Sequence, residues 1–114
     1  MNVERETAVL NASDSEREEE RPLSLLSAEK VKQELGSLPG WKLENKEIVR
    51  TYEFPDFPAA IEFVRRVAEK AEIAGHHPDI DIRYNKVRLA LVSHDEGGLT
   101  VRDMAMARSL NLLG

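Results

Sequence analysis

The segment GHHPDIDIRYNKVRLALVSHDEGG, residues 75–98, decides the fold and contains all three histidines of the 114-residue chain. Two runs within it alternate apolar and polar residues, and this alternation predicts two β-strands. The apolar members are Ile80, Ile82 and Tyr84 in the first run and Val87, Leu89 and Leu91 in the second. Asn85-Lys86 lies between the runs and is typical of a two-residue turn, so the segment is expected to form a β-hairpin.

The expected turn brings the histidines together. With this turn, Ile82 pairs with Leu89, and His77 lies opposite His94. Directly opposed residues of a hairpin have Cβ atoms about 4.5–5.5 Å apart. The proline that follows His77 interrupts the ladder, so the pairing at this end is approximate. Because His76 adjoins His77, the pattern predicts three imidazoles in one small region.

A long amphipathic helix is expected before the hairpin. Asp56 is a suitable N-cap, and Gly75 is typical of a residue that ends a helix. Between them, apolar residues recur at helical spacing, namely Phe57, Ala60, Ile61, Val64, Val67, Ala68 and Ala71. Glu72 falls in the last turn, four residues before His76. A carboxylate beside an imidazole can fix its tautomer or raise its pKa, so the layout favours proton transfer.

A second helix is expected after the hairpin. Thr100 and Asp103 have the spacing of a capping box, which marks the start of a helix. The apolar residues expected on it are Val101, Met104, Ala105 and Leu112. On local grounds, Asp103 is interpreted as a helix cap before it is considered a catalytic group.

The residues before the long helix predict a further helix and hairpin. Ser27 can cap a short helix that Gly36 ends, and its apolar stripe comprises Ala28, Val31 and Leu35. Residues 41–44 and 47–54 then form strands joined at Asn45-Lys46. The expected order is α-β-β-α-β-β-α. Paired strands between helices predict an α+β fold, a four-stranded antiparallel sheet with three helices packed on one face.

The charges divide the chain into a tail and one domain. Residues 1–22 hold seven of the 21 acidic residues and three of the 16 basic ones, so residues 23–114 are nearly neutral, with 14 acids and 13 bases. The first segment is expected to be a flexible acidic tail, a possible site for a protein partner, and the rest a single domain. Without a basic face, nucleic-acid binding is not expected. The chain has no cysteine and no recognisable signal peptide or membrane span, so a cytoplasmic location is expected.

Other interpretations of the histidine cluster remain open. The adjacent pair could be ordinary polar loop residues. A metal site could use His77 and His94 with Asp79, Asp95 or Glu72, but the chain has neither cysteine nor the HExxH spacing, and no metal is expected. Ser93 precedes His94 but should project from the opposite strand face, which disfavours a nucleophilic triad.

Seven of these residues together resemble the motif of the pterin-4a-carbinolamine dehydratase family. They are Glu72, His76, His77, Pro78, Tyr84, His94 and Asp103. The resemblance extends over about residues 27–112 and includes Trp41, Asp56 and Phe63. This sequence departs from the common pattern at Ile80, where many relatives have an aromatic residue, and at Ser93, where threonine is frequent.

The resemblance implies the fold derived above, dimers or tetramers, and a reaction. A 4a-hydroxytetrahydropterin loses water to give a quinonoid dihydropterin, with no cofactor besides the pterin substrate. His76 and His94 would be the acid–base pair, and His77 would orient the pterin. The resemblance assigns substrate-binding or orienting roles to Glu72, Pro78, Tyr84, Ser93 and Asp103. It also implies an alternative, because some relatives are non-catalytic interaction proteins that serve as dimerisation cofactors of transcription factors or as carboxylase assembly factors. The complete set of histidines and acids favours catalysis.

Overall fold

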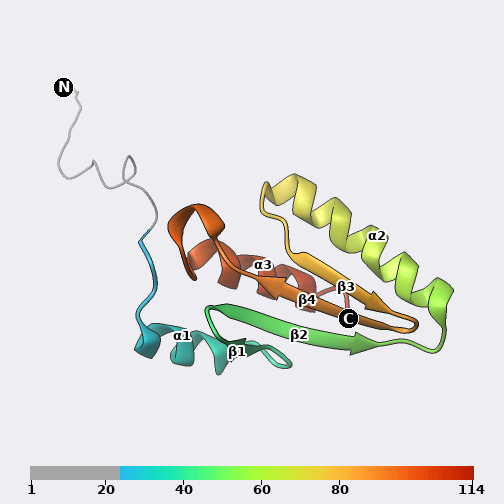
Figure 1. The fold of residues 1–114 in the computed structure, drawn as a ribbon, viewed down its shortest axis with the longest axis horizontal. Helices are drawn as coiled ribbons and strands as arrows, with labels where there is room; N and C mark the ends of the chain where they lie inside the picture. The colour runs from blue at the N-terminus through green and yellow to red at the C-terminus, as the bar shows by residue number, and fades with distance from the viewer. Residues whose placement is uncertain (1–23) are drawn as a thin grey trace.

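The fold is an α+β layer in which helices cover one face of a four-stranded antiparallel sheet (Figure 1). A computed structural model describes residues 24–114, and the predicted acidic tail at residues 1–22 lies outside the described residues. The elements in chain order are α1 (Ala28–Leu35), β1 (Lys42–Glu44), β2 (Glu47–Glu53), α2 (Phe57–Ala74), β3 (Asp79–Arg83), β4 (Lys86–Leu91), the short 3-10 helix η2 (His94–Glu96) and α3 (Val101–Asn111). The predicted order and fold class are confirmed.

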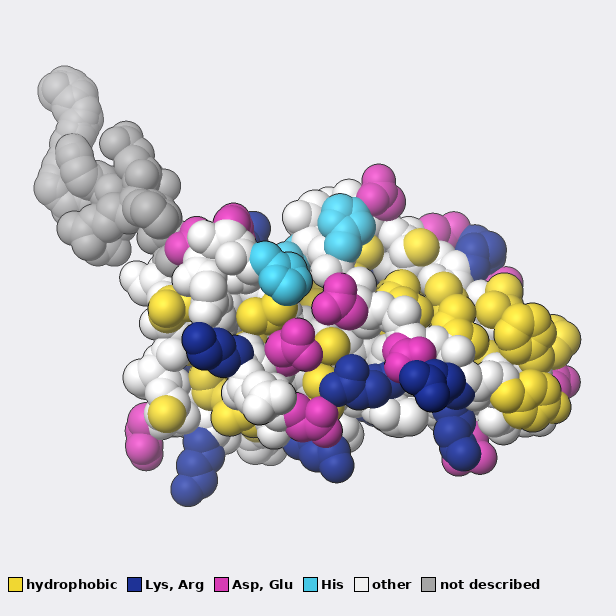
Figure 2. All heavy atoms as spheres, viewed as in Figure 1, with side chains coloured by type: hydrophobic (Ala, Val, Ile, Leu, Met, Phe, Trp, Pro, Cys, Tyr) yellow, Lys and Arg dark blue, Asp and Glu magenta, His cyan; other side chains and the backbone are white. Residues whose placement is uncertain are grey.

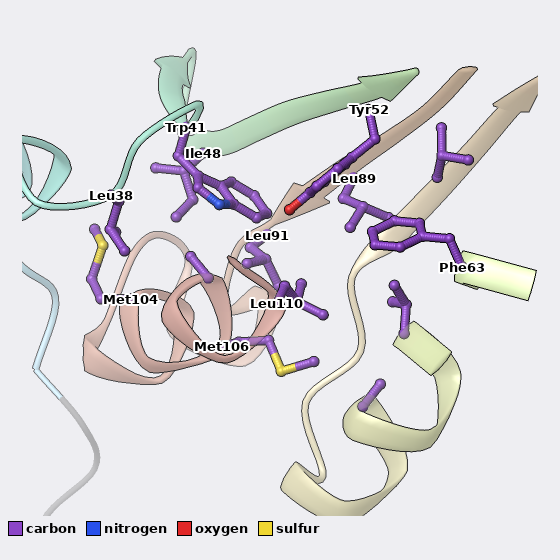
Figure 3. Close-up of a cluster of buried hydrophobic side chains, with 14 of the residues drawn as sticks. Leu38, Trp41, Ile48, Tyr52, Phe63, Leu89, Leu91, Met104, Met106 and Leu110 are labelled. Atoms are coloured by element: carbon purple, nitrogen blue, oxygen red, sulfur yellow. The ribbon is translucent and has the colours of Figure 1, made fainter. Parts of the chain in front are cut away.

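The strands lie in the order β1-β2-β4-β3, so β4 is central and β3 forms an edge. Val87, Leu89 and Leu91 of β4 are completely buried. Burying each of these side chains stabilises the fold by about 1.5–3 kcal/mol. Figure 3 shows this core, in which side chains of the sheet meet those of α2 and α3. β4 is therefore held firmly in the core, and the segment that carries His94 follows it directly in the chain.

Local capping signals set the helix boundaries as predicted. The side chains of Ser27, Asp56 and Thr100 accept backbone N–H groups at the starts of α1, α2 and α3. Thr100 and Asp103 form the expected capping box. Gly75 ends α2 with φ 65°, a left-handed conformation that glycine adopts without steric strain.

The second hairpin corrects the predicted register. Its turn is Tyr84-Asn85, one residue earlier than expected, so Ile82 pairs with Val87 and not with Leu89. Asn85 causes the shift, because its side chain donates to the carbonyl of Phe54 at 2.7 Å and its carbonyl accepts from the Phe54 N–H at 2.9 Å. Each β3 residue therefore pairs with the β4 residue two positions before the expected one. Because side chains alternate between the two faces with a period of two, every side chain keeps its expected face. The first hairpin has its turn at Asn45-Lys46, as predicted.

The buried stripes of two helices also differ from expectation. On α2, Phe57 and Ile61 are exposed and Phe63 is buried, so the core-facing positions are Ala60, Phe63, Val67 and Ala71. On α3, Val101 is exposed, and Leu112 is exposed beyond the end of the helix. The inward face of α3 comprises Asp103, Met104, Met106, Ala107 and Leu110. An acidic residue belongs to this face, and apolar periodicity alone could not reveal it.

Candidate active site

The left-handed Gly75 turns the chain back sharply at the end of α2. The Gly75 and His76 backbone N–H groups both donate to the carbonyl of Ala71, which satisfies an open end of the helix. This turn holds the His76 side chain against the body of the protein, where the residue is only 8% exposed. His77 remains exposed on the surface beside it.

A buried carboxylate fixes the His76 ring. Asp103 is completely buried on the first turn of α3, and its Oδ1 lies 2.6 Å from His76 Nε2. Its Oδ2 accepts from the Ser93 hydroxyl and from the Thr100 backbone N–H, both at 2.9 Å. These donors satisfy the carboxylate, as a buried charge requires. Asp103 therefore caps α3 and also orients a histidine.

Ser93 connects this network to the third histidine. Its backbone N–H donates to the Gly98 carbonyl at 3.0 Å, and its carbonyl accepts from the Gly97 N–H at 2.9 Å. The resulting tight turn contains η2, which begins with the exposed His94. Ser93 is completely buried, and its hydroxyl lies 2.9 Å from the hydroxyl of Thr100. The serine hydroxyl thus contacts buried partners while the neighbouring His94 is exposed, and within residues 24–114 no hydrogen bond joins the two side chains.

A second histidine–carboxylate pair lies on the surface. His77 Nε2 is 2.6 Å from Glu72 Oε2, but the two side chains are 60% and 77% exposed. Exposed ion pairs contribute little to stability because water and salt screen them. Carboxylates do accompany the imidazoles, as expected. Glu72 contacts His77, and the carboxylate that contacts His76 is that of Asp103.

The three imidazoles line one pocket of about 340 Å³. Its lining residues are Gly75, His76, His77, Val92, His94, Asp95 and Arg102. Figure 2 shows histidine side chains close to one another on one face of the molecule, with acidic side chains beside them. The predicted gathering of histidines is confirmed, but the predicted strand pairing of His77 with His94 is wrong. The ladder between β3 and β4 ends at Asp79 and Ala90, and His94 belongs to a 3-10 turn.

None of the five residues expected to bind or orient the substrate lines this pocket itself. Glu72 and Asp103 contact its histidines, and Ser93 contacts Asp103, whereas Pro78 and Tyr84 have no such contact within residues 24–114. Pro78 is buried directly before β3. Tyr84 is 67% exposed in the hairpin turn, at the other end of the five-residue strand β3. A strand of this length spans about 16 Å, so Tyr84 and the pocket are at opposite ends of the strand.

The structure adds pocket residues that the sequence did not identify. Arg102 lines the pocket, and its Nη2 donates to Asp95 Oδ1 at 2.9 Å. From the sequence, Asp95 is expected only as an alternative metal ligand. The available signal was the position of Arg102 between Thr100 and Asp103, but a residue at the start of a helix commonly faces solvent. Within residues 24–114, no group of three or more histidine or acidic side chains is arranged to hold a metal ion.

The fold and the pocket define a class of protein, an α+β layer with a histidine and carboxylate site suited to acid–base chemistry on a small molecule. Residues 24–113 match the family described as pterin 4 alpha carbinolamine dehydratase. The chain belongs to this family. None of the helices in residues 24–114 is both long and apolar enough to cross a membrane.

Individual relatives agree with this assignment. The chain is 59% identical over 91 residues to a protein of Acidobacterium capsulatum provisionally named pterin-4-alpha-carbinolamine dehydratase, covering 80% of this chain and 99% of that one. A protein of Chloroflexus aurantiacus with the same provisional name is 58% identical, covering 75% and 92%. The structure of a transcriptional coactivator/pterin dehydratase from Brucella melitensis aligns with a TM-score of 0.76 and 34% identity, covering 79% and 98%.

A more distant structure shares the fold. It is a pterin dehydratase-like protein identified as a RuBisCO assembly factor in the alpha-carboxysome, and it aligns with a TM-score of 0.53 and 19% identity. The alignment covers 64% of this chain and 84% of that one. At this identity, the likeness concerns the fold alone.

Proposed function

We propose that this protein is a dehydratase that removes water from 4a-hydroxytetrahydropterin and releases quinonoid dihydropterin. One observation carries the proposal. Three imidazoles line a single pocket, and the most buried of them, His76, is bonded to the fully buried carboxylate of Asp103. The reaction requires one proton to be removed from the substrate and another to be delivered to it, and imidazole does both near neutral pH.

His76 is the proposed general base. A carboxylate can only accept a hydrogen bond, so Asp103 selects the tautomer in which His76 Nε2 carries the proton. The other ring nitrogen, Nδ1, then has a lone pair, and it makes no hydrogen bond with residues 24–114. In the proposed reaction this nitrogen removes the proton from N5 of the pterin. Asp103 stabilises the imidazolium that forms, as the carboxylate does in other histidine dyads.

His94 is the proposed general acid. The residue is exposed on η2 and lines the same pocket as His76. In the protonated form it donates to the 4a-oxygen as the bond from C4a to oxygen breaks. The electron pair of the former N5–H bond forms the double bond between C4a and N5, and the oxygen leaves as water. The two proton transfers complete the reaction, so the proposal includes no cofactor.

The remaining motif residues have supporting roles in the proposal. His77, held by Glu72, orients the pterin at the mouth of the pocket. Ser93 supports the Asp103 carboxylate from inside the fold. Pro78 and Tyr84 are kept in the proposal as residues that bind or orient the substrate. Because Tyr84 lies far along β3 from the pocket, it would contribute to the pocket of a neighbouring copy in the expected dimer or tetramer. A cytoplasmic location is also part of the proposal.

An interaction role is the second candidate. It is favoured by the Brucella melitensis relative, which is described as a transcriptional coactivator as well as a pterin dehydratase. A protein with that role alone does not need the buried bond between His76 and Asp103. The two candidates therefore differ in whether the pocket accelerates a reaction.

The test is the rate of dehydration of synthetic 4a-hydroxytetrahydropterin, followed by the absorbance of the quinonoid product. Wild-type protein is expected to exceed the spontaneous rate, and His76→Ala and His94→Ala are each expected to lose about 10²-fold or more of that acceleration. Circular dichroism of each variant controls for unfolding. A wild-type rate equal to the spontaneous rate would leave only the interaction role.

A further inference from the structure

Arg102 is a charged pocket residue without a role in the mechanism above. It lies on the first turn of α3, directly before Asp103, and lines the histidine pocket. It also lines a neighbouring pocket of about 180 Å³ between the end of α2 and α3, together with Ala74, His76, Ala105, Met106 and Ser109. Arg102 and His76 thus line both cavities.

The protein leaves most of the Arg102 donors open. A guanidinium has five N–H donors in a rigid plane. One nitrogen, Nη2, donates to Asp95 at 2.9 Å, and this is the side chain's only hydrogen bond within residues 24–114. Nε is buried there without any partner, which is unusual for a buried polar atom. The side chain is 36% exposed, so the rest of the guanidinium can meet a ligand in the pocket.

Asp95 holds this group in place. It adjoins His94 on η2, so its ion pair with Arg102 ties the turn that carries one histidine to the helix that carries Asp103. A guanidinium held on one side by a carboxylate is preorganised, because less side-chain freedom is lost when a ligand binds. The position and the open donors suit a planar ligand with an acceptor oxygen at its edge.

We infer that Arg102 determines ligand orientation and specificity, by donating a hydrogen bond to the carbonyl oxygen on C4 of a 4-oxopteridine ring. The inference rests on the proposed function, because it takes a pterin as the ligand. C4 is bonded to C4a, the carbon that loses the hydroxyl group. A bond to the C4 oxygen therefore fixes the reacting carbon and the adjacent N5 relative to the imidazoles. Asp95 is a positioning residue that acts through Arg102.

The test uses two ligands that do not react, pterin and 2,4-diaminopteridine, at pH 8. They differ at C4, where pterin has a carbonyl acceptor and the second compound an amino donor. Binding is measured by calorimetry to wild type, Arg102→Met and Arg102→Lys. Hydrogen bonds to a charged donor change affinity by roughly 10- to 100-fold. We expect wild type to prefer pterin by at least about tenfold, Arg102→Met to lose the preference, and Arg102→Lys to keep part of it.

Arg108→Met is the matched control, because it removes the same charge from the same helix at a residue paired with Glu34 outside the pocket. It should keep the wild-type preference. An equal preference in wild type and Arg102→Met would overturn the inference, and so would a wild type that binds pterin without preferring it. A wild type that binds neither compound and does not accelerate dehydration would instead overturn the proposed function. A role of Arg102 in folding alone would change the melting temperature but not the ratio of the two affinities.

Discussion

The Nε2 atom of His76 lies 2.6 Å from Oδ1 of Asp103, and the two residues come from segments 27 positions apart in the chain. The carboxylate is completely buried and also accepts from the backbone N–H of Thr100 in the capping box of α3. The start of a helix and the orientation of a histidine thus depend on the same side chain. This relationship ties the connection after α2, which carries His76, to the first turn of α3.

Asp103→Asn should reduce the dehydration rate by about 10²-fold or more, since an amide can present its N–H₂ group to His76 and favour the wrong tautomer. It should also lower the free energy of unfolding by about 1–3 kcal/mol, because an amide cannot satisfy all the donors around this position. Initial rates and urea unfolding measure the two effects. Ser93→Ala, which removes one hydrogen bond to the carboxylate and the contact with the Thr100 hydroxyl but leaves the bond between Asp103 and His76, should lose less activity. Full activity in Asp103→Asn would refute the role of the carboxylate.

Glu72→Gln should reduce the rate by less than about tenfold. The pair between Glu72 and His77 has the same 2.6 Å separation, but both side chains are mostly exposed and water screens the interaction. The same assay, run side by side with Asp103→Asn at low and high salt, compares the two carboxylates. If Glu72→Gln lost as much activity as Asp103→Asn, solvent exposure would not determine how much each carboxylate contributes to the rate.

Sequence reasoning recovered the features that depend on neighbouring residues. The caps at Ser27, Asp56 and Thr100 and the end of α2 at Gly75 are local signals, so the helices were predicted within a residue or two. The alternation in β3 and β4 correctly predicted the hairpin, and the histidines do gather in one pocket.

The errors come from contacts that the local sequence patterns do not reveal. The hairpin turn was misplaced by one residue because Asn85 bonds to Phe54, which is 31 positions away. Arg102 was overlooked because its partner Asp95 becomes a neighbour only when η2 folds against α3. Neither contact can be predicted from the periodicity of apolar residues in the sequence.

Asn111→Ala should destabilise the protein without affecting the pocket. The Asn111 side-chain oxygen accepts from Trp41 Nε1 at 2.7 Å and from Arg50 Nη1 at 2.5 Å, and its amide donates to the Pro39 carbonyl at 3.2 Å. These bonds tie the end of α3 to the sheet, and their loss should cost about 1–3 kcal/mol in urea unfolding. Asn111→Asp keeps the acceptor for Trp41 and Arg50, so it should lose less. An unchanged free energy of unfolding in Asn111→Ala would contradict this assignment.

Glu34→Gln should reduce stability in a manner that depends on pH. The hydrogen bond from Arg108 on α3 lowers the pKa of Glu34 on α1 below its usual value. Because the pKa is lower in the folded state, the contribution is present at neutral pH and is lost as the pH falls through the folded-state pKa. The difference between wild type and variant should therefore be visible at pH 7 and shrink below the usual glutamate range.

Thermal unfolding across this pH range measures the effect of Glu34. Glu29→Gln is the control on the same helix, because Glu29 makes no ion pair with residues 24–114. A wild-type advantage over Glu34→Gln that grows toward low pH would have the wrong sign for this explanation.

The most direct test of the central claim is the dehydration rate of 4a-hydroxytetrahydropterin with wild type, His76→Ala, Asp103→Asn and the double variant. If Asp103 acts through His76 in a catalytic pocket, wild type exceeds the spontaneous rate, both single variants are slow, and the double variant is no slower than His76→Ala. A wild type that does not exceed the spontaneous rate would contradict the account, as would losses that multiply fully in the double variant.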